Sequence, residues 1–377
     1  MSVIQRISVH SHCNDLGGKV WNPAITWTKK YAVFITLENE HGVTGVGECW
    51  CFDTMPDVLV AYLRTEICPL IVGTNTEEIP KIYRQLLSRA TLTARHGLLA
   101  SAWSGVDIAA WDLCSREADL PLWKYIARQY PADAKSDRKV KLYASGGLYG
   151  KDKSVNDLVS EVQSMSAAGF DIVKMKIGGL SIADDKERIK AVLDGLDTSC
   201  KLIIDGVYRY TEAQALEIFN TLPRARVEAF QSPVKASALA SMKSLTDSDV
   251  PVMATEAEYR TEIHQQLIQT GAVRYLQAAP VAVGGIQRLV ELGAELNNTD
   301  VRLSLEVSST AIALLAACHF AAATKTVEHV EYHYLHQVFF EDLDLMQPER
   351  GWISLPDKPG IGMELKNKNE LYTACQR

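Results

Sequence analysis

The stretch DIVKMKIGG (Asp171–Gly179) is a short apolar run that ends in two lysines and then two glycines. In a β-strand, residues two positions apart point to the same side, so Lys174 and Lys176 aim their ammonium groups into the same space. Two like charges at that separation repel, and burial increases the cost of each charge. We therefore expect a strand whose end lies beside compensating negative charge.

Seven more short apolar runs lie between residues 139 and 332, and amphipathic helical patterns separate them. In chain order the eight runs are VKLYAS, DIVKMKI, KLIID, VEAFQ, VPVMATE, VRYLQAA, VRLSLE and VEHVEY. Strands that alternate with helices predict a parallel sheet. Eight of them, with no obvious edge strand, favour a (β/α)8-type (modified TIM) barrel at residues 131–332. An open doubly wound sheet is the alternative.

The rest of the chain lacks this alternation. Residues 1–130 predict an N-terminal α+β capping domain, in which Tyr31–Asn39 and Val43–Trp50 form a hairpin around an EHG turn. The run GVTGVG lies between strands with no helix after it, which argues against a phosphate-binding loop. Residues 333–377, which contain the run GWISLPDKPGIGMELKN, are expected to return and pack on the capping domain. Helical patterns of the first part cover Met55–Glu66, Thr76–Arg89 and His96–Ala118.

The composition of the 377-residue chain excludes some classes of partner. A formal net charge of -7 and a pI near 5.8 argue against nucleic-acid and membrane partners, since both require a basic face, although a local basic pocket can hold a small anionic substrate. No run reaches the roughly 18 apolar residues of a spanning helix. The first residues, MSVIQRISVHSH, lack the apolar core of a signal peptide. Eight scattered cysteines without a CxxC predict reduced thiols and a cytoplasmic location.

The ends of the predicted strands carry the chemistry, because sites of such barrels lie where strands end. The three runs after the lysine strand end in Asp205, Gln231 and Glu256, about one strand-helix unit apart. A single polar strand end is ordinary, since strand ends meet water. Three oxygen-bearing side chains on successive strands, however, can converge on one point. Two carboxylates and an amide oxygen are hard ligands that suit Mg²⁺.

A cation at this point would give the lysine pair a role. A neighbouring positive charge and burial both lower the pKa of a lysine, and a lysine tuned toward neutrality can act as a general base. Glu306 ends the seventh strand. Among apolar walls it could be an acid with a raised pKa, or it could be a hydrogen-bonded structural carboxylate. Tyr143 and Tyr208 are further candidates for substrate contact. His96, His319 and His333 are expected to be structural.

Several motifs resemble those of the enolase superfamily, in its mandelate racemase/muconate lactonizing enzyme branch. They are HGVTGVGEC, RHGLLASAWSGVDIAAWDL, VKMKIGG, VGGIQRL and LPDKPGIGME, and they span nearly the whole chain. The resemblance implies that Asp205, Gln231 and Glu256 bind Mg²⁺, that Lys176 is the base and that Lys174 neutralises the substrate carboxylate. It also implies capping loops near Asp15–Thr26 and Trp50–Met55 that close over the substrate, and a homo-oligomer. The superfamily abstracts a proton next to a carboxylate and stabilises the resulting enediolate with Mg²⁺.

The chain departs from the family pattern at five positions, one of which is Ser232, where relatives carry a glutamate or a glutamine. Gln231 replaces a glutamate, which removes a formal charge from the metal site, and Val207 replaces an asparagine. Ala279 stands where relatives carry an aspartate or a lysine, and Glu306 stands where one branch carries a histidine. With Lys176 as the one base, racemisation by two bases is disfavoured unless Glu306 serves on the other face.

The expected activity is therefore a Mg²⁺-dependent lyase in which Lys176, Lys174 and Glu306 are catalytic and a small carboxylate, most plausibly an acid sugar, loses water. Lys174, Tyr143 and Tyr208 are the expected substrate contacts. An isomerase, cycloisomerase or racemase of the same superfamily is the alternative. A non-catalytic or metal-impaired relative that binds small carboxylates is the third possibility.

Overall fold

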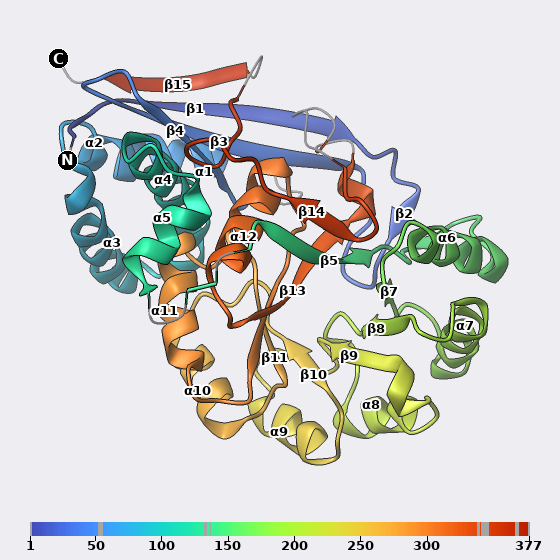
Figure 1. Ribbon diagram of the computed structural model, residues 1–377. Coiled ribbons are helices and arrows are strands. Elements are labelled where there is room, and N and C mark those ends of the chain that lie inside the picture. Colours follow the sequence, from blue (N-terminus) through green and yellow to red (C-terminus); the bar gives the residue numbers. More distant parts are fainter. Residues whose placement is uncertain are drawn as a thin grey trace.

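The structure is a computed structural model, and it describes residues 2–51, 56–131, 134–135, 137–337, 340, 347–365 and 369–375. A parallel barrel occupies the lower part of Figure 1, and an antiparallel sheet with helices lies above it. No helix among the described residues is both long and apolar enough to cross a membrane.

Eight parallel strands form the barrel, and pairing of β13 with β5 closes it, so the prediction of a closed barrel is confirmed. Each predicted apolar run is one of its strands. The strands are β5 (Lys139–Ser145), β7 (Ile172–Lys176), β8 (Lys201–Asp205), β9 (Val227–Gln231), β10 (Val252–Ala254), β11 (Tyr275–Ala278), β12 (Arg302–Leu305) and β13 (Val327–His333).

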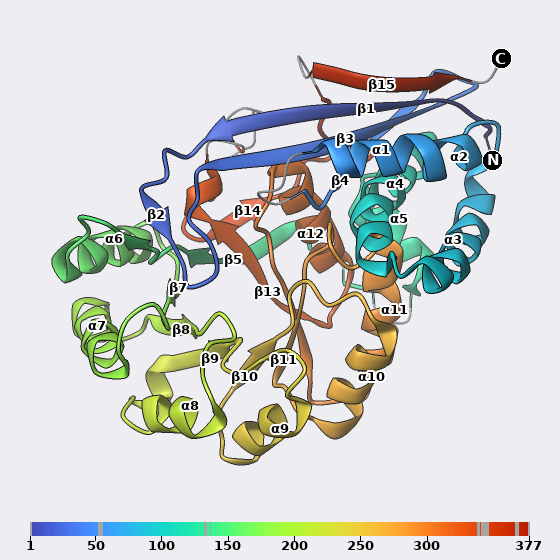
Figure 2. The same ribbon diagram turned by 180° about the vertical axis from the view of Figure 1, so that it is seen from behind.

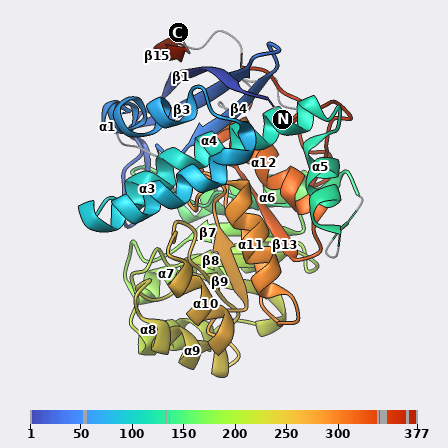
Figure 3. The same ribbon diagram turned by 90° about the vertical axis from the view of Figure 1, so that its left-hand side faces the viewer.

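Helices follow the strands and cover the outside of the barrel (Figures 1 and 2). Serine or threonine caps begin four of them. Ser154, Ser181 and Thr211 each accept a hydrogen bond from the backbone N–H three residues on, and Thr310 accepts one from the backbone N–H two residues on. The helices are α6 (Val155–Ala167), α7 (Ile182–Gly195), α8 (Glu212–Phe219), α9 (Leu239–Asp247), α10 (Thr261–Thr270), α11 (Ile286–Leu296) and α12 (Ala311–Ala323). Every residue of α12 is buried, because this helix lies between the barrel and the sheet above it (Figure 3).

The cap is built on a four-stranded antiparallel sheet in the order β15-β1-β3-β4. Its strands are β1 (Ile4–Asp15), β3 (Lys29–Asn39), β4 (Thr44–Cys49) and β15 (Asn369–Cys375). The first long strand, β1, was not among the expected elements. The helices of the cap are α1 (Asp57–Tyr62), α2 (Cys68–Ile71), α3 (Ile79–Thr93), α4 (His96–Glu117) and α5 (Leu122–Gln129), with a π-helical turn over Leu63–Ile67 and a 3-10 turn over Thr76–Glu78.

The glycines of GVTGVG have a packing role, because β4 lies directly on α4. A Cβ atom at Gly45 would come within 2.2 Å of the Ala109 carbonyl oxygen, and one at Gly47 within 2.0 Å of the Gly105 carbonyl oxygen. The close approach of strand and helix therefore requires glycine at both positions. This agrees with the expectation that the run is not a phosphate-binding loop.

Two short strands tie the N-terminal and C-terminal segments to the barrel. β2 (Val20–Trp21) pairs with β6 (Tyr149–Gly150), which follows β5, and the rings of Trp21 and Tyr149 stack 4.5 Å apart. β14 (Trp352–Ser354) pairs with β5, whereas β15 pairs with β1. The C-terminal segment thus contacts both the barrel and the cap sheet.

Candidate active site

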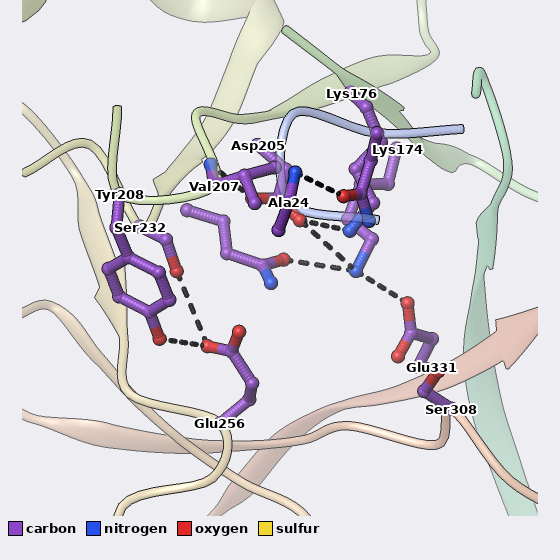
Figure 4. A network of polar contacts seen from close by, with 12 residues as sticks. Ala24, Lys174, Lys176, Asp205, Val207, Tyr208, Ser232, Glu256, Ser308 and Glu331 are labelled. Carbon is purple, nitrogen blue, oxygen red and sulfur yellow. Dashed lines mark hydrogen bonds and ion pairs between the residues drawn. The ribbon is translucent and has the colours of Figure 1, made fainter. Parts of the chain in front are cut away.

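The three expected oxygen ligands lie at one level of the barrel. In the ladder between β7 and β8, Lys176 is the partner of Asp205, and in the next ladder Asp205 is the partner of Gln231. Glu256 lies just beyond the end of β10. Figure 4 shows that Lys174, Lys176, Asp205 and Glu256 surround a common space.

The lysine pair contacts two of these ligands. Lys176 Nζ lies 2.5 Å from Asp205 Oδ2. Lys174 Nζ donates to Gln231 Oε1 at 3.0 Å and lies 3.9 Å from Asp205 Oδ2. The side chain of Lys174 is 1% exposed and that of Lys176 is 13% exposed, so Lys176 is the member of the pair that faces the mouth.

The expected role of Lys174, neutralising the substrate carboxylate, requires a charged side chain. Burial does lower the pKa of Lys174, but the neighbouring carboxylates of Glu331 and Asp205 outweigh it and hold this pKa above its usual value. Lys174 is therefore an ammonium ion throughout the neutral range. This state suits a partner for a carboxylate rather than a base.

The sequence reasoning missed Glu331, the closest partner of Lys174. Its Oε1 lies 2.5 Å from Lys174 Nζ, and its Oε2 accepts a hydrogen bond from the Val307 backbone N–H at 3.0 Å. Burial alone would raise the pKa of Glu331, but Lys174 and Lys176 hold it below its usual range. The sequence did contain the information, because Glu331 lies near the end of the eighth apolar run, VEHVEY. The search for polar residues at strand ends was not extended to that run.

Glu256 is held by the loops that follow β8 and β9. Tyr208 donates its hydroxyl to Glu256 Oε2 at 2.5 Å, and Ser232 Oγ donates to the same oxygen at 3.3 Å. Val207, Tyr208 and Ser232 all have positive φ, at 46°, 60° and 45°. This conformation is strained for a β-branched valine, and such strain gathers at functional sites. Tyr208, expected to contact substrate, thus contacts a candidate metal ligand.

Glu306 follows β12 and stands across the mouth from the lysines, since β5 and β13 separate β12 from β7 in the closed barrel. Its side chain is buried, and no hydrogen-bond partner for Oε2 is found within the described residues. Burial raises the pKa of Glu306 to about 8, with a further rise from Glu331 and a partial opposition from Lys174. At neutral pH this carboxyl therefore carries its proton.

Tyr143 lies inside the barrel below the lysines. Its side chain is buried, and Lys174 Nζ is 5.5 Å from the centroid of its ring. Ala279, also buried, offers no ionisable group at its position. His333, expected outside the mouth, ends β13 and is buried, and burial together with Lys174 and Lys176 holds its pKa well below the usual value.

The expected capping loops are only partly described. Figure 4 includes Ala24, from the first loop, among the residues drawn for the polar network of the mouth. The β2–β6 pairing anchors the start of that loop on the barrel. In the second loop, residues 52–55 lie outside the described residues.

The donor set fits Mg²⁺. Asp205, Gln231 and Glu256 offer only oxygen atoms, which are the ligands that this hard cation prefers. Burial raises the pKa of Glu256, and the charge of Asp205 raises it further, whereas the hydrogen bond from Tyr208 and the charge of Lys176 oppose the rise. Clusters of three or more His, Cys, Asp or Glu side chains suited to a metal do not occur in the described part of the chain. The candidate set here has two carboxylates, and its third member is the amide of Gln231.

Comparison with known proteins establishes the family. A model of the mandelate racemase/muconate lactonizing enzyme N-terminal domain matches residues 22–127, and a model of an enolase C-terminal domain-like unit matches residues 157–369. The chain belongs to the mandelate racemase/muconate lactonizing enzyme family of the enolase superfamily.

Individual members of the family are distant. Arabinonate dehydratase of Saccharolobus solfataricus is 26% identical over 336 residues, 88% of this chain and 87% of that protein. D-galactarolactone cycloisomerase of Agrobacterium fabrum is 24% identical over 360 residues, 92% of each chain. The solved structure of L-talarate dehydratase from Polaromonas sp. JS666, complexed with Mg and L-glucarate, superposes with a TM-score of 0.85 at 21% identity and covers 100% of both chains.

Proposed function

We propose that this protein is a Mg²⁺-dependent lyase that removes water from an acid sugar, beginning with abstraction of the proton next to the carboxylate. The observation that carries the proposal is the opposition of a lysine pair and a protonated carboxyl. Lys176 lies beside the oxygen ligands, and Glu306 stands across the mouth with its proton in place. Similarity to dehydratases such as arabinonate dehydratase supports the same reaction class.

The residues have distinct roles in this reaction. The ammonium group of Lys174 pairs with the substrate carboxylate. Lys176 Nζ takes the proton from the α-carbon, and Asp205 Oδ2 at 2.5 Å stabilises the ammonium ion that results. Mg²⁺ held by Asp205, Gln231 and Glu256 would stabilise the negative charge that develops on the carboxylate oxygens.

Glu306 completes the elimination. Its carboxyl donates a proton to the hydroxyl on the β-carbon, the C–O bond breaks and water leaves. The substrate thus loses one proton to Lys176 and one hydroxide to the proton of Glu306, and the remaining enol becomes a 2-keto acid. A carboxyl whose pKa is about 8 keeps its proton at neutral pH, as this step requires.

Proton NMR in D₂O tests the proposal. The protein is incubated with Mg²⁺ and a panel of aldonic and aldaric acids, and exchange of the α-proton and formation of a 2-keto acid are followed. Lys176→Met is the control, because methionine matches the length of lysine without its basic nitrogen. If no acid sugar reacts, while Lys176→Met binds the same ligands as the wild type, the lyase proposal is wrong.

A cycloisomerase is the second candidate, favoured by similarity to D-galactarolactone cycloisomerase over 92% of each chain. Such an enzyme shares the first proton transfer but releases no water. The mass of the product separates the two activities, because a lyase product is lighter by one water molecule. Binding of acid sugars without α-proton exchange would instead indicate a non-catalytic relative.

A further inference from the structure

The segment that connects Glu306 to α12 is held from outside the barrel. Two charged side chains of the cap sheet, Lys30 and Glu48, bind this segment. The Ser308 carbonyl oxygen accepts a hydrogen bond from Lys30, and the hydroxyls of Ser309 and Thr310 donate to Glu48. Lys30 and Glu48 lie more than 250 positions earlier in the sequence. Both are buried, Lys30 to 1% exposure and Glu48 to 0%.

Glu48, at the end of β4, accepts hydrogen bonds from the start of α12. Its Oε2 accepts from Thr310 Oγ1 at 2.6 Å and from the Ala313 backbone N–H at 3.1 Å, and its Oε1 accepts from the Thr310 backbone N–H at 3.2 Å and from Ser309 Oγ. The first turn of a helix leaves backbone N–H groups without partners, and a carboxylate there also complements the helix dipole. Glu48 therefore fixes where α12 begins, five residues after Glu306.

Lys30, on β3, holds the same segment by its backbone. Its Nζ donates to the Ser308 carbonyl oxygen at 2.6 Å. The ammonium group lies 5.3 Å from the ring centroid of Trp27 and 5.4 Å from that of Trp50, which are favourable cation–π distances. Side chains alternate along a strand, so the neighbouring Lys29 points to the opposite face and is exposed.

We propose that Lys30 and Glu48 are positioning residues, which reach from the cap to the segment 307–310 and thereby fix the Glu306 carboxyl over the substrate. This inference rests on the proposed function, because it concerns the acid of that reaction. Since Lys30 lies on β3 and Trp50 begins the second capping loop directly after β4, the same contacts couple the cap to the acid. Neither Lys30 nor Glu48 needs to touch the substrate.

The charge of Lys30 gives the proposal a second consequence. The charged or titratable groups that act on Glu306 are Glu331 of β13, Lys174 of β7, Glu256 beyond β10, Lys30 of β3 and, below them, Tyr143 of β5. Lys30 lowers the pKa of Glu306, so a neutral side chain at position 30 must raise it. The loss of activity at alkaline pH, which marks deprotonation of the acid, should then move to higher pH.

Two variants and one matched control test the proposal. Glu48→Gln keeps the size of the side chain but replaces one acceptor oxygen by an amide that donates. Lys30→Met keeps packing between the tryptophans and removes the charge, and Lys29→Met makes the same change on the exposed face. Amide hydrogen exchange at Thr310 and Ala313 is measured without substrate, and kcat, KM and the pH profile are measured with the acid sugar that the wild type converts.

In Glu48→Gln, exchange at Thr310 and Ala313 should accelerate about tenfold, and kcat should fall up to about 10²-fold with little change in KM, as displacement of a catalytic group by about 1 Å does. In Lys30→Met the loss of activity at alkaline pH should move to higher pH, whereas in Lys29→Met it should stay at the pH of the wild type. Unchanged exchange in Glu48→Gln, or an alkaline loss of activity that stays in place in Lys30→Met, would overturn the proposal. If the wild type converts no acid sugar, the proposed function fails, and exchange then decides whether the cap holds this segment.

Discussion

Replacing Glu331 by glutamine should strip the buried Lys174 ammonium group of its closest counter-charge. The two charged atoms lie 2.5 Å apart, and their side chains are 1% and 0% exposed. The remaining carboxylate near Lys174 is Asp205, at 3.9 Å, and it also pairs with Lys176 at 2.5 Å. A glutamine at this position would keep a hydrogen-bonding side chain of the same shape, so the change isolates the charge.

The expected cost follows from burial. Removal of one partner from a buried ion pair costs about 3–5 kcal/mol, because the other charge stays buried without compensation. For a 377-residue chain that unfolds as one unit, the entropy of unfolding is about 0.8 kcal/mol per kelvin, so each kcal/mol moves the melting temperature by about 1.3 °C. The variant should therefore melt about 4–6 °C below the wild type.

Calorimetry at pH 7 without added metal measures this cost, with Lys174→Met and the double variant completing a cycle. The double variant should be more stable, by about 2 kcal/mol or more, than the sum of the two single changes predicts, because it leaves neither charge of the pair buried alone. Glu328→Gln is the control, because Glu328 lies on the same strand but is exposed, and its change should stay within about 0.5 kcal/mol. If Glu331→Gln melts as the wild type does, or if the cycle shows no coupling, the charge balance inferred for this mouth is wrong.

Three further changes test other parts of the structure. Gln231→Glu restores a carboxylate to the oxygen ligands, so calorimetric titration should show at least about tenfold tighter Mg²⁺ binding, and equal affinity would exclude Gln231 as a ligand. Burial raises the pKa of Asp107 to about 7, and this carboxyl accepts a hydrogen bond from the Gln287 N–H. Between pH 5 and 7 the folded state therefore holds a proton on Asp107 that the unfolded state has lost, so the free energy of unfolding of the wild type should fall by about 2 kcal/mol over this range. Denaturant titrations should show this dependence on pH for the wild type and not for Asp107→Asn. At Gly285, where φ is 94°, a Cβ atom would lie 2.2 Å from Asp107 Oδ2, whereas a Cβ atom at Gly271 would have no neighbour within 4 Å. Gly285→Ala should therefore lower the melting temperature far more than Gly271→Ala.

Much of the site was readable along the chain. Lys174, Lys176, Asp205 and Gln231 end successive runs, and in parallel strands with regular connections the ends of neighbours meet at the same level. The ladder partners Lys176 with Asp205 and Asp205 with Gln231, as that rule requires. The periodicity of apolar residues along the chain was enough to predict which strand ends meet, because each strand is followed by a helix and then by the strand that pairs with it.

The partner of Lys174 was not found by that reasoning. Closure of the eighth strand on the first was expected, but the strand ends were not read as far as Glu331, and its contact with Lys174 depends on how both side chains are buried. The charge of Lys174 also depends on that carboxylate, because burial by itself would lower its pKa.

The alternation of strands and helices, and the residues that end the strands, are properties of the chain read in order. The pKa of Glu306 depends on burial and on charges from other strands, which act through space. The hydrogen bonds of Lys30 and Glu48 to the segment after Glu306 form only when the cap packs on the barrel. Lys30 stands in the sequence just before the predicted strand Tyr31–Asn39, and its burial against Trp27 and Trp50 follows from that packing.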